Sequence, residues 1–243
     1  MDNPTSAKLL LASLDLTSLN DTDTNEQIAE FCRLVDTPYG KPAAVCVYSR
    51  FIPTVRENLG DEMKIATVIN FPQGVLDENI LEREISQALK LGADELDVVL
   101  PYKALLAKDE AGCLSYLHRA RELAGKNTLK IIIESGELKS LAYIRRAAQL
   151  CIEAKADFIK TSSGKTPISA TPEAANIILE TIKASKTDTG FKASGGIRTF
   201  ADAKNYLVLA QSIMGTSWVN AAHFRIGASS LLKDLLKTIE QGY

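Results

Sequence analysis

The chain has 243 residues, 46% of them hydrophobic, and its 28 lysines and arginines nearly balance its 30 acidic residues, so the net charge is −2. This length fits one large domain or two small ones, and the near-neutral charge excludes a general basic surface for nucleic acid or anionic lipid. We expect any bound anion to be held by a local site.

The N-terminal residues and the cysteines indicate a compartment. Residues 1–6 lack the basic segment and the long apolar core of a signal peptide, and no window approaches about 18 uninterrupted apolar residues. The cysteines show no C-x-x-C spacing; they are Cys32, Cys46, Cys113 and Cys151. We therefore expect a soluble cytoplasmic protein with reduced, mostly buried thiols and no membrane partner.

The chain has only two histidines, His118 and His223. Their spacing cannot pair two ligands on one helix face or turn, so a His-rich catalytic zinc site is not expected. We predict neither a metal nor a cofactor. His118 falls in a polar helical segment, and His223 follows a W-V-N-A-A run that could place it in a loop near the mouth of a barrel.

Apolar runs with strand character alternate along the chain with helical patterns. We expect strands at residues 13–17, 42–48, 64–70, 95–100, 129–135, 157–160, 190–192 and 212–215. We expect helices at residues 6–14, 25–35, 51–59, 76–91, 102–124, 138–154, from 171 onward, 201–210 and 229–239.

Several of these helices carry boundary signals in the sequence. Thr24, followed three residues later by Gln27, predicts a capping box. Thr171 followed by Pro172 predicts an N-cap with proline at the first helical position. Gly60 fits the end of the helix that begins near residue 51.

The alternation predicts the fold class. After a short N-terminal helix, eight strand and helix units follow at roughly 30 residues each, which is typical of a (β/α)8 TIM barrel of about 250 residues. No linker or change in composition divides the chain, so we predict a single barrel domain over residues 1–243. A doubly wound open sheet is the alternative, although no G-x-G-x-x-G motif follows the first strand.

Two lysines end predicted strands. Lys160 closes an F-I-K run and Lys192 lies in a G-F-K run, and each is followed by a glycine-containing loop. A strand-end lysine usually extends to the surface, but two in neighbouring strands about 4.8 Å apart can share one cavity. Burial together would lower the pKa of at least one, and a neutral lysine amine forms a Schiff base with a carbonyl.

Asp97 is an acid embedded in the apolar run L-D-V-V. It could balance the charge of a buried lysine, relay protons to a bound imine, or do both. In a barrel, polar residues at the C-terminal strand ends meet at one face. Those expected there to contact a substrate are Asp15, Thr17 and Cys46, and Asn70 and Glu134 also fall at strand ends.

Glycine-containing loops after the sixth, seventh and eighth strands predict a phosphate site, because they allow a backbone to approach an anion closely. A single loop of this kind is also typical of an ordinary turn. The residues that we expect at this site are Gly164, Lys165, Gly195, Gly196, Arg198, Gly227, Ser229 and Ser230.

Together these motifs resemble those of the deoxyribose-phosphate aldolase family, in order and over almost the whole chain. They are D-L-T-S-L-N at residues 15–20, N-F-P-Q-G at 70–74, E-L-D-V-V at 95–99, F-I-K-T-S at 158–162, K-A-S-G-G-I-R at 192–198 and G-A-S-S at 227–230. The resemblance implies a class I aldolase in deoxyribose phosphate catabolism that reversibly cleaves 2-deoxy-D-ribose 5-phosphate to acetaldehyde and D-glyceraldehyde 3-phosphate.

The resemblance also implies residue roles. Lys160 would be the Schiff-base lysine, with Asp97 and Lys192 as the proton donor and acceptor pair. A homo-oligomer, with a dimer favoured, is a family-level expectation. Some relatives end in a tyrosine-bearing tail that assists proton transfer, but we do not include Tyr243 in the predicted site.

Two other functions fit the same residues. A phosphosugar isomerase on the same barrel would use Asp97 as a base without a covalent step. A non-catalytic barrel could bind a sugar phosphate as a regulator, although the two buried lysines would then be unexplained.

Overall fold

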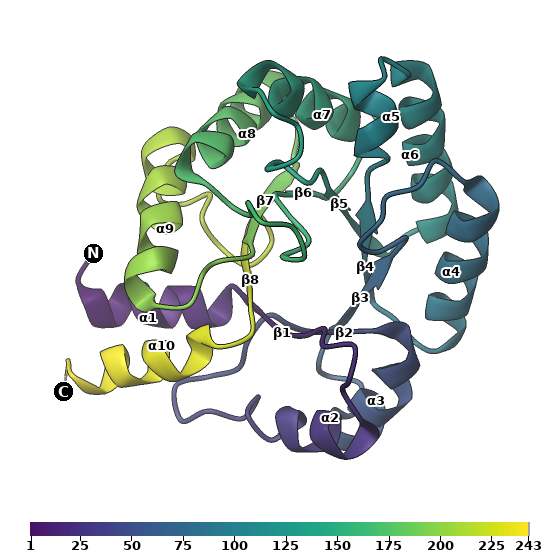
Figure 1. Cartoon of the computed structure of the whole chain (residues 1–243). Coiled ribbons are helices and arrows are strands. Elements are labelled where there is room, and N and C mark those ends of the chain that lie inside the picture. Colours follow the sequence, from purple (N-terminus) through teal and green to yellow (C-terminus); the bar gives the residue numbers. More distant parts are fainter. Residues whose placement is uncertain (243) are drawn as a thin grey trace.

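Eight parallel strands close into a barrel that helices surround (Figure 1). The computed structural model describes residues 1–242. Each strand pairs with the next in sequence, and the last pairs with the first. The strands are β1 (Leu14–Ser18), β2 (Ala44–Val47), β3 (Ile65–Ile69), β4 (Glu95–Val99), β5 (Thr128–Ile132), β6 (Phe158–Lys160), β7 (Gly190–Ser194) and β8 (Phe224–Ala228). The protein is therefore a (β/α)8 barrel, as the sequence predicts.

Helices cover the outside of the barrel, and α1 precedes the first strand and packs against α9 and α10 (Figure 1). They are α1 (Asn3–Ala12), α2 (Asn25–Cys32), α3 (Ile52–Leu59), α4 (Glu78–Lys90), α5 (Tyr102–Leu106), α6 (Glu110–Ala124), α7 (Leu141–Glu153), α8 (Pro172–Ser185), α9 (Phe200–Met214) and α10 (Leu231–Glu240), with a 3-10 turn η1 at Ser49–Phe51. Among residues 1–242, no helix is long and apolar enough to cross a membrane.

The predicted boundary signals are confirmed. Thr24 and Gln27 form the capping box of α2, and the Thr171 hydroxyl accepts a hydrogen bond from a backbone N–H in the first turn of α8. The helix expected at residues 102–124 is divided into α5 and α6. Lys108 adopts a left-handed backbone with φ 68°, and the carboxylate of Asp109 caps the second helix.

The last strand lies later in the chain than predicted. Residues 212–214 are the end of α9, which stops at Gly215 with φ 94°, and β8 begins only at residue 224. The apolar residues at 213 and 214 continue the helical pattern of α9, so their strand character was misread. The true strand was hidden because Arg225 interrupts its apolar run.

The inside and the outside of the barrel differ in kind. The main core packs the outer strand faces against the helices, and a separate small apolar cluster consists of Ala44, Cys46, Ala66 and Val68 on β2 and β3. The rest of the interior, from β4 through β8 to β1, holds charged side chains. Six of the eight strands therefore supply charged side chains to the interior, and β2 and β3 supply the small apolar ones.

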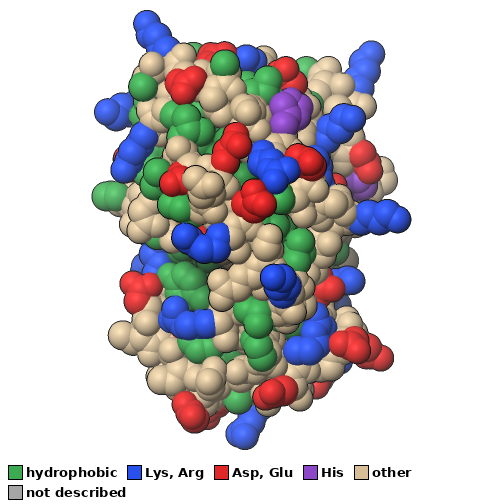
Figure 2. All heavy atoms as spheres, turned by 90° about the vertical axis from the view of Figure 1, so that its right-hand side faces the viewer, with side chains coloured by type: hydrophobic (Ala, Val, Ile, Leu, Met, Phe, Trp, Pro, Cys, Tyr) green, Lys and Arg blue, Asp and Glu red, His purple; other side chains and the backbone are tan. Residues whose placement is uncertain are grey.

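The outer surface shows no comparable segregation of charge on the face seen in Figure 2, which is the right-hand side of Figure 1. Acidic and basic side chains are interspersed there (Figure 2). Arg119 of α6 illustrates the pattern, since its guanidinium lies 3.1 Å from Glu82 of α4 and 2.7 Å from Glu122. Such exposed pairs contribute little to stability, and the unusual electrostatics lie inside the barrel.

Candidate active site

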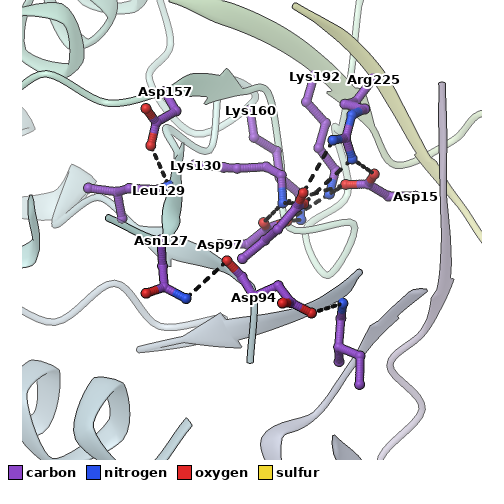
Figure 3. A network of polar contacts seen from close by, with 12 residues as sticks. Asp15, Asp94, Asp97, Asn127, Leu129, Lys130, Asp157, Lys160, Lys192 and Arg225 are labelled. Atoms are coloured by element: carbon purple, nitrogen blue, oxygen red, sulfur yellow. Dashed lines mark hydrogen bonds and ion pairs between the residues drawn. The ribbon is translucent and has the colours of Figure 1, made fainter. Parts of the chain in front are cut away.

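Seven charged side chains meet inside the barrel and form one ion network (Figure 3). They extend from six strands, β1 and β4 through β8, and all are buried. The cations are Lys130, Lys160, Lys192 and Arg225, and the carboxylates are Asp15, Glu95 and Asp97.

The strand register explains why these side chains meet. Lys160 and Lys192 are direct partners across β6 and β7, and Asp97 is the partner of Lys130 across β4 and β5. Side chains of paired residues in neighbouring strands point to the same face of a sheet, which here is the barrel interior. The predicted sharing of one cavity by the two strand-end lysines is confirmed.

Asp97 is the centre of the network. Its Oδ2 accepts hydrogen bonds from the ammonium groups of Lys160 and Lys192, both at 2.8 Å. Its Oδ1 accepts one from Lys130, also at 2.8 Å. Burial by itself would raise the pKa of Asp97, but the three ammonium groups overcome this effect and hold the pKa well below its usual range.

Lys192 has two carboxylate partners, because it also pairs with Asp15. Burial disfavours its charge, yet Asp15 and Asp97 together raise the pKa of Lys192 above its usual value. Asp15 is itself bound by the Arg225 guanidinium at 2.6 Å. Lys192 therefore remains an ammonium ion.

Lys160 has one carboxylate contact in the network, to the Asp97 oxygen that Lys192 shares. Burial lowers the pKa of Lys160, Asp97 opposes the shift only in part, and the charge of Lys192 adds to it. The predicted lowering of one lysine pKa is thus found at Lys160, and burial is a larger cause than the neighbouring lysine.

Three members of this network were not predicted from the sequence. The Lys130 ammonium lies 2.5 Å from Glu95, and the Arg225 guanidinium lies 3.2 Å from the other oxygen of the same carboxylate. A signal was present, since Lys130 interrupts the apolar run L-K-I-I and Arg225 interrupts F-R-I-G. A charge within a buried run points into the barrel for the same reason that Lys160 does.

The balance of charge agrees with the pKa directions. The network holds four cations and three carboxylates, so it has one surplus positive charge when every group is ionised. Loss of one proton from the least compensated cation removes this surplus, and Lys160 has the fewest carboxylate contacts. The arrangement can therefore present a neutral, nucleophilic amine at the end of β6.

A cavity of about 260 Å³ lies where the loops after β1, β6, β7 and β8 meet. Every residue predicted for the phosphate site lines it, and so does Thr17; the set is Thr17, Gly164, Lys165, Gly195, Gly196, Arg198, Gly227, Ser229 and Ser230. A Cβ atom added at Gly227 would come within 3.0 Å of the Lys192 side chain. The cavity thus adjoins the ion network.

The backbone of this cavity depends on glycine. Gly195 and Gly196 have φ of 85° and 78°, which other residues rarely adopt. A Cβ added at Gly195 would lie 3.1 Å from the Cα of Gly164 and 2.6 Å from Ser169. Two loops therefore approach each other at backbone distance beside α10, whose N-cap residue Ser230 makes no side-chain capping bond.

Glu134 and Lys165 hold the loop after β6 in place. The buried Glu134 carboxylate accepts hydrogen bonds from the Ser163 N–H at 3.2 Å and the Thr166 hydroxyl at 3.2 Å. Lys165 donates to the Leu19 carbonyl in the loop after β1 at 2.7 Å. Glu134 therefore has a positioning role at this rim.

Two residues predicted to contact a substrate do not line this cavity. Asp15 lies beneath it with its carboxylate engaged by Lys192 and Arg225. Cys46 belongs to the small apolar cluster, and burial raises the pKa of its thiol. All four cysteines are buried, as predicted.

Three other residues considered from the sequence lie away from these groups or outside the described chain. Asn70 is buried, and its amide donates to the Tyr116 hydroxyl at 2.7 Å, which makes it a structural residue. His223 immediately precedes β8 and so lies at the opposite end of the barrel from the mouth, where it pairs with Asp188. The prediction that it lies near the mouth was wrong. Tyr243 lies outside the described residues.

Comparison with known proteins gives a consistent result. The family model of DeoC/LacD family aldolases matches residues 9–237. A Toxoplasma gondii protein, provisionally identified as a deoxyribose-phosphate aldolase, is 26% identical with a TM-score of 0.90 over 98% of this chain and 97% of that one. A tetrameric deoxyribose phosphate aldolase from Aeropyrum pernix is 26% identical with a TM-score of 0.78 over 98% of this chain and 94% of that one.

We predict unequal stability effects for two members of the network. Asp97→Asn leaves buried ammonium groups without their shared carboxylate and should lower the free energy of unfolding by about 3–5 kcal/mol. Lys160→Met removes the least compensated charge and should change it by less than about 1 kcal/mol. Urea unfolding near neutral pH measures both. Equal losses in the two variants would contradict Lys160 as the least compensated cation of the network.

Proposed function

We propose that this chain, which belongs to the DeoC/LacD family of aldolases, reversibly cleaves 2-deoxy-D-ribose 5-phosphate. The products are acetaldehyde and D-glyceraldehyde 3-phosphate, and the reaction proceeds through a lysine Schiff base. The substrate is suggested by the relatives identified as deoxyribose-phosphate aldolases. The observation that carries the mechanism is the buried Lys160, whose pKa is lowered in a network with one surplus cation. The reaction would serve deoxyribose phosphate catabolism.

In the first step, the neutral amine of Lys160 adds to the C1 aldehyde of the open-chain sugar. The resulting carbinolamine loses its hydroxyl as water, and a protonated imine forms. Lys192 and Asp97 lie at the reacting nitrogen, since both lysines bind the same Asp97 oxygen at 2.8 Å. This proximity supports the Lys192 ammonium as the donor of the proton that the departing water requires.

The imine then accepts the electron pair of the C2–C3 bond. The C3 hydroxyl gives up its proton as the bond breaks, and glyceraldehyde 3-phosphate leaves with a new carbonyl at its former C3. The enamine that remains takes a proton at C2, and hydrolysis of the imine releases acetaldehyde and restores Lys160. Asp97 and Lys192, acting through a water molecule, would carry these protons.

The phosphate group would occupy the cavity beside this network. Backbone N–H groups at Gly195 and Gly196, the open N-terminus of α10 at Ser229 and Ser230, and the Lys165 ammonium suit an anion. Binding energy gained there lies away from the reacting carbons and can orient C1 toward Lys160.

The contacts of Asp97 disfavour the isomerase alternative. A base that removes a proton directly from carbon must present a free oxygen to that carbon, whereas both oxygens of Asp97 accept hydrogen bonds from ammonium groups at 2.8 Å. A regulator that only binds sugar phosphate would leave the desolvated Lys160 without a use.

We predict that borohydride reduction in the presence of acetaldehyde attaches an ethyl group to Lys160. The reason is that the neutral amine forms an imine that the hydride reduces to a stable secondary amine. Mass spectrometry of the peptide that contains Lys160 is the measurement. The peptide with Lys126, an exposed lysine beyond α6, serves as the internal control.

Lys160→Leu should abolish both the adduct and the cleavage of deoxyribose 5-phosphate while the protein stays folded. An adduct at another lysine, or turnover by the variant, would refute the proposed mechanism.

For the phosphate cavity, we predict that Lys165→Met raises KM for deoxyribose 5-phosphate about tenfold, because one charged contact to phosphate is lost. The value of kcat/KM for unphosphorylated deoxyribose should stay within about twofold. Steady-state kinetics on both sugars measures the difference. Lys126→Met makes the same change of charge at the other end of the barrel and is the matched control; an equal loss on both sugars would remove Lys165 from the phosphate site.

We also propose that the chain forms a homo-oligomer, with a dimer favoured. The tetrameric relative supports self-association, as do the exposed apolar side chains of Leu141 and Ile168, which line one groove beside α7 and α8. Sedimentation velocity at micromolar concentration should show a species of at least twice the chain mass. A single species with the mass of one chain would contradict this.

A further inference from the structure

We infer that Arg225 and Glu95 are positioning residues that set the protonation of Lys160 from the far end of the barrel interior. The inference rests on the proposed Schiff-base function. Neither residue contacts Lys160 directly. Arg225 lies near the start of β8 and Glu95 is the first residue of β4, whereas Lys160 is the last residue of β6.

The two residues pair across the width of the barrel. β4 and β8 lie opposite each other in the closed strand order (Figure 1), and the Arg225 guanidinium spans the gap to reach Glu95 at 3.2 Å. Only 7% of Arg225 and 3% of Glu95 is exposed. Water therefore screens their charges weakly, and each acts on the other buried groups at long range.

Contacts connect this pair to Lys160 along two routes. From Arg225 the route passes through Asp15 and Lys192 to the Oδ2 atom of Asp97. From Glu95 it passes through Lys130 to the Oδ1 atom of Asp97. Both routes end on the carboxylate that binds Lys160, so a change of charge at either origin alters how strongly Asp97 compensates that lysine.

The charge balance of the network gives the direction of each effect. Arg225 supplies the fourth cation, and without it the remaining three cations match the three carboxylates even when Lys160 is protonated. Without the Glu95 charge, four cations face two carboxylates, and protonation of Lys160 becomes less favourable. The two residues therefore shift the equilibrium of Lys160 in opposite senses.

Other titratable groups near Lys160 do not replace this control. Those that interact with it are Asp97, Lys192, Cys46 and Glu134, and Lys130 and Asp15 belong to the same ion network. Burial raises the pKa of the Cys46 thiol, which keeps it neutral. The Glu134 carboxylate is engaged by the backbone and hydroxyl of the loop after β6. Neither group contacts Arg225 or Glu95.

The test measures the rate of acetaldehyde and borohydride trapping at Lys160 against pH. Only the neutral amine adds to the aldehyde, so the rate rises as pH rises through the Lys160 pKa. We call this rising part of the pH profile the limb. Arg225→Gln should move this limb to higher pH by about one unit, and Glu95→Gln should move it to lower pH by about one unit. On the acidic side, trapping should become about tenfold slower in the first variant and about tenfold faster in the second.

The double variant Glu95→Gln with Arg225→Gln restores one surplus cation and should return the limb to within about 0.3 units of the wild-type position. A merely structural pair would not produce shifts of opposite sign that cancel. Arg225→Lys keeps the charge while changing the hydrogen bonds, and its limb should stay near that of the wild type. Thermal unfolding identifies the variants that fold. One folded single variant is enough for the test, because the direction of the pH shift is predicted separately for each.

The outcomes separate the inference from the proposed function. If wild-type Lys160 is trapped and the limb does not move in a folded variant, or moves in the opposite direction, the positioning role is overturned. If wild-type protein is not trapped at Lys160 at any pH, the Schiff-base function itself fails.

Discussion

The active site depends on one buried carboxylate shared by three buried ammonium groups. Asp97 accepts a hydrogen bond from each of Lys130, Lys160 and Lys192. A carboxylate buried in this interior stays ionised because it has such partners. Because the network holds more cations than carboxylates, one lysine is compensated poorly. The lowered pKa of Lys160 is a property of its surroundings, because burial and the charge of Lys192 outweigh the one contact with Asp97.

Different parts of the barrel hold different kinds of side chain. Small apolar side chains on β2 and β3 line the uncharged part of the interior, while glycines in the loops after β6 and β7 line an open cavity. Each ion pair beneath joins side chains from two different strands, and six strands supply the members. The loops around the cavity can thus change without displacing Lys160, which stands on a strand.

Much of this could be read from the sequence, since charges within buried apolar runs and glycines after them mark the interior and the rim of a barrel. Lys160, Lys192 and Asp97 were found in this way. Arg225 and Lys130 carried the same signal but were missed. The eighth strand was placed in α9 because a short apolar run has no periodicity of its own, and only pairing with β1 and β7 identifies the true strand.

The sequence by itself determined the alternation of strands and helices, the strand-end lysines and the loops that can approach a phosphate, because these follow from local pattern and residue chemistry. Tertiary structure alone decided which of two similar lysines has its pKa lowered. Lys192 and Lys160 stand in like runs, but barrel closure brings Asp15 of β1 to Lys192 and leaves Lys160 with a shared oxygen of Asp97. A pKa depends on neighbours in space, and those neighbours come from strands far apart in the chain.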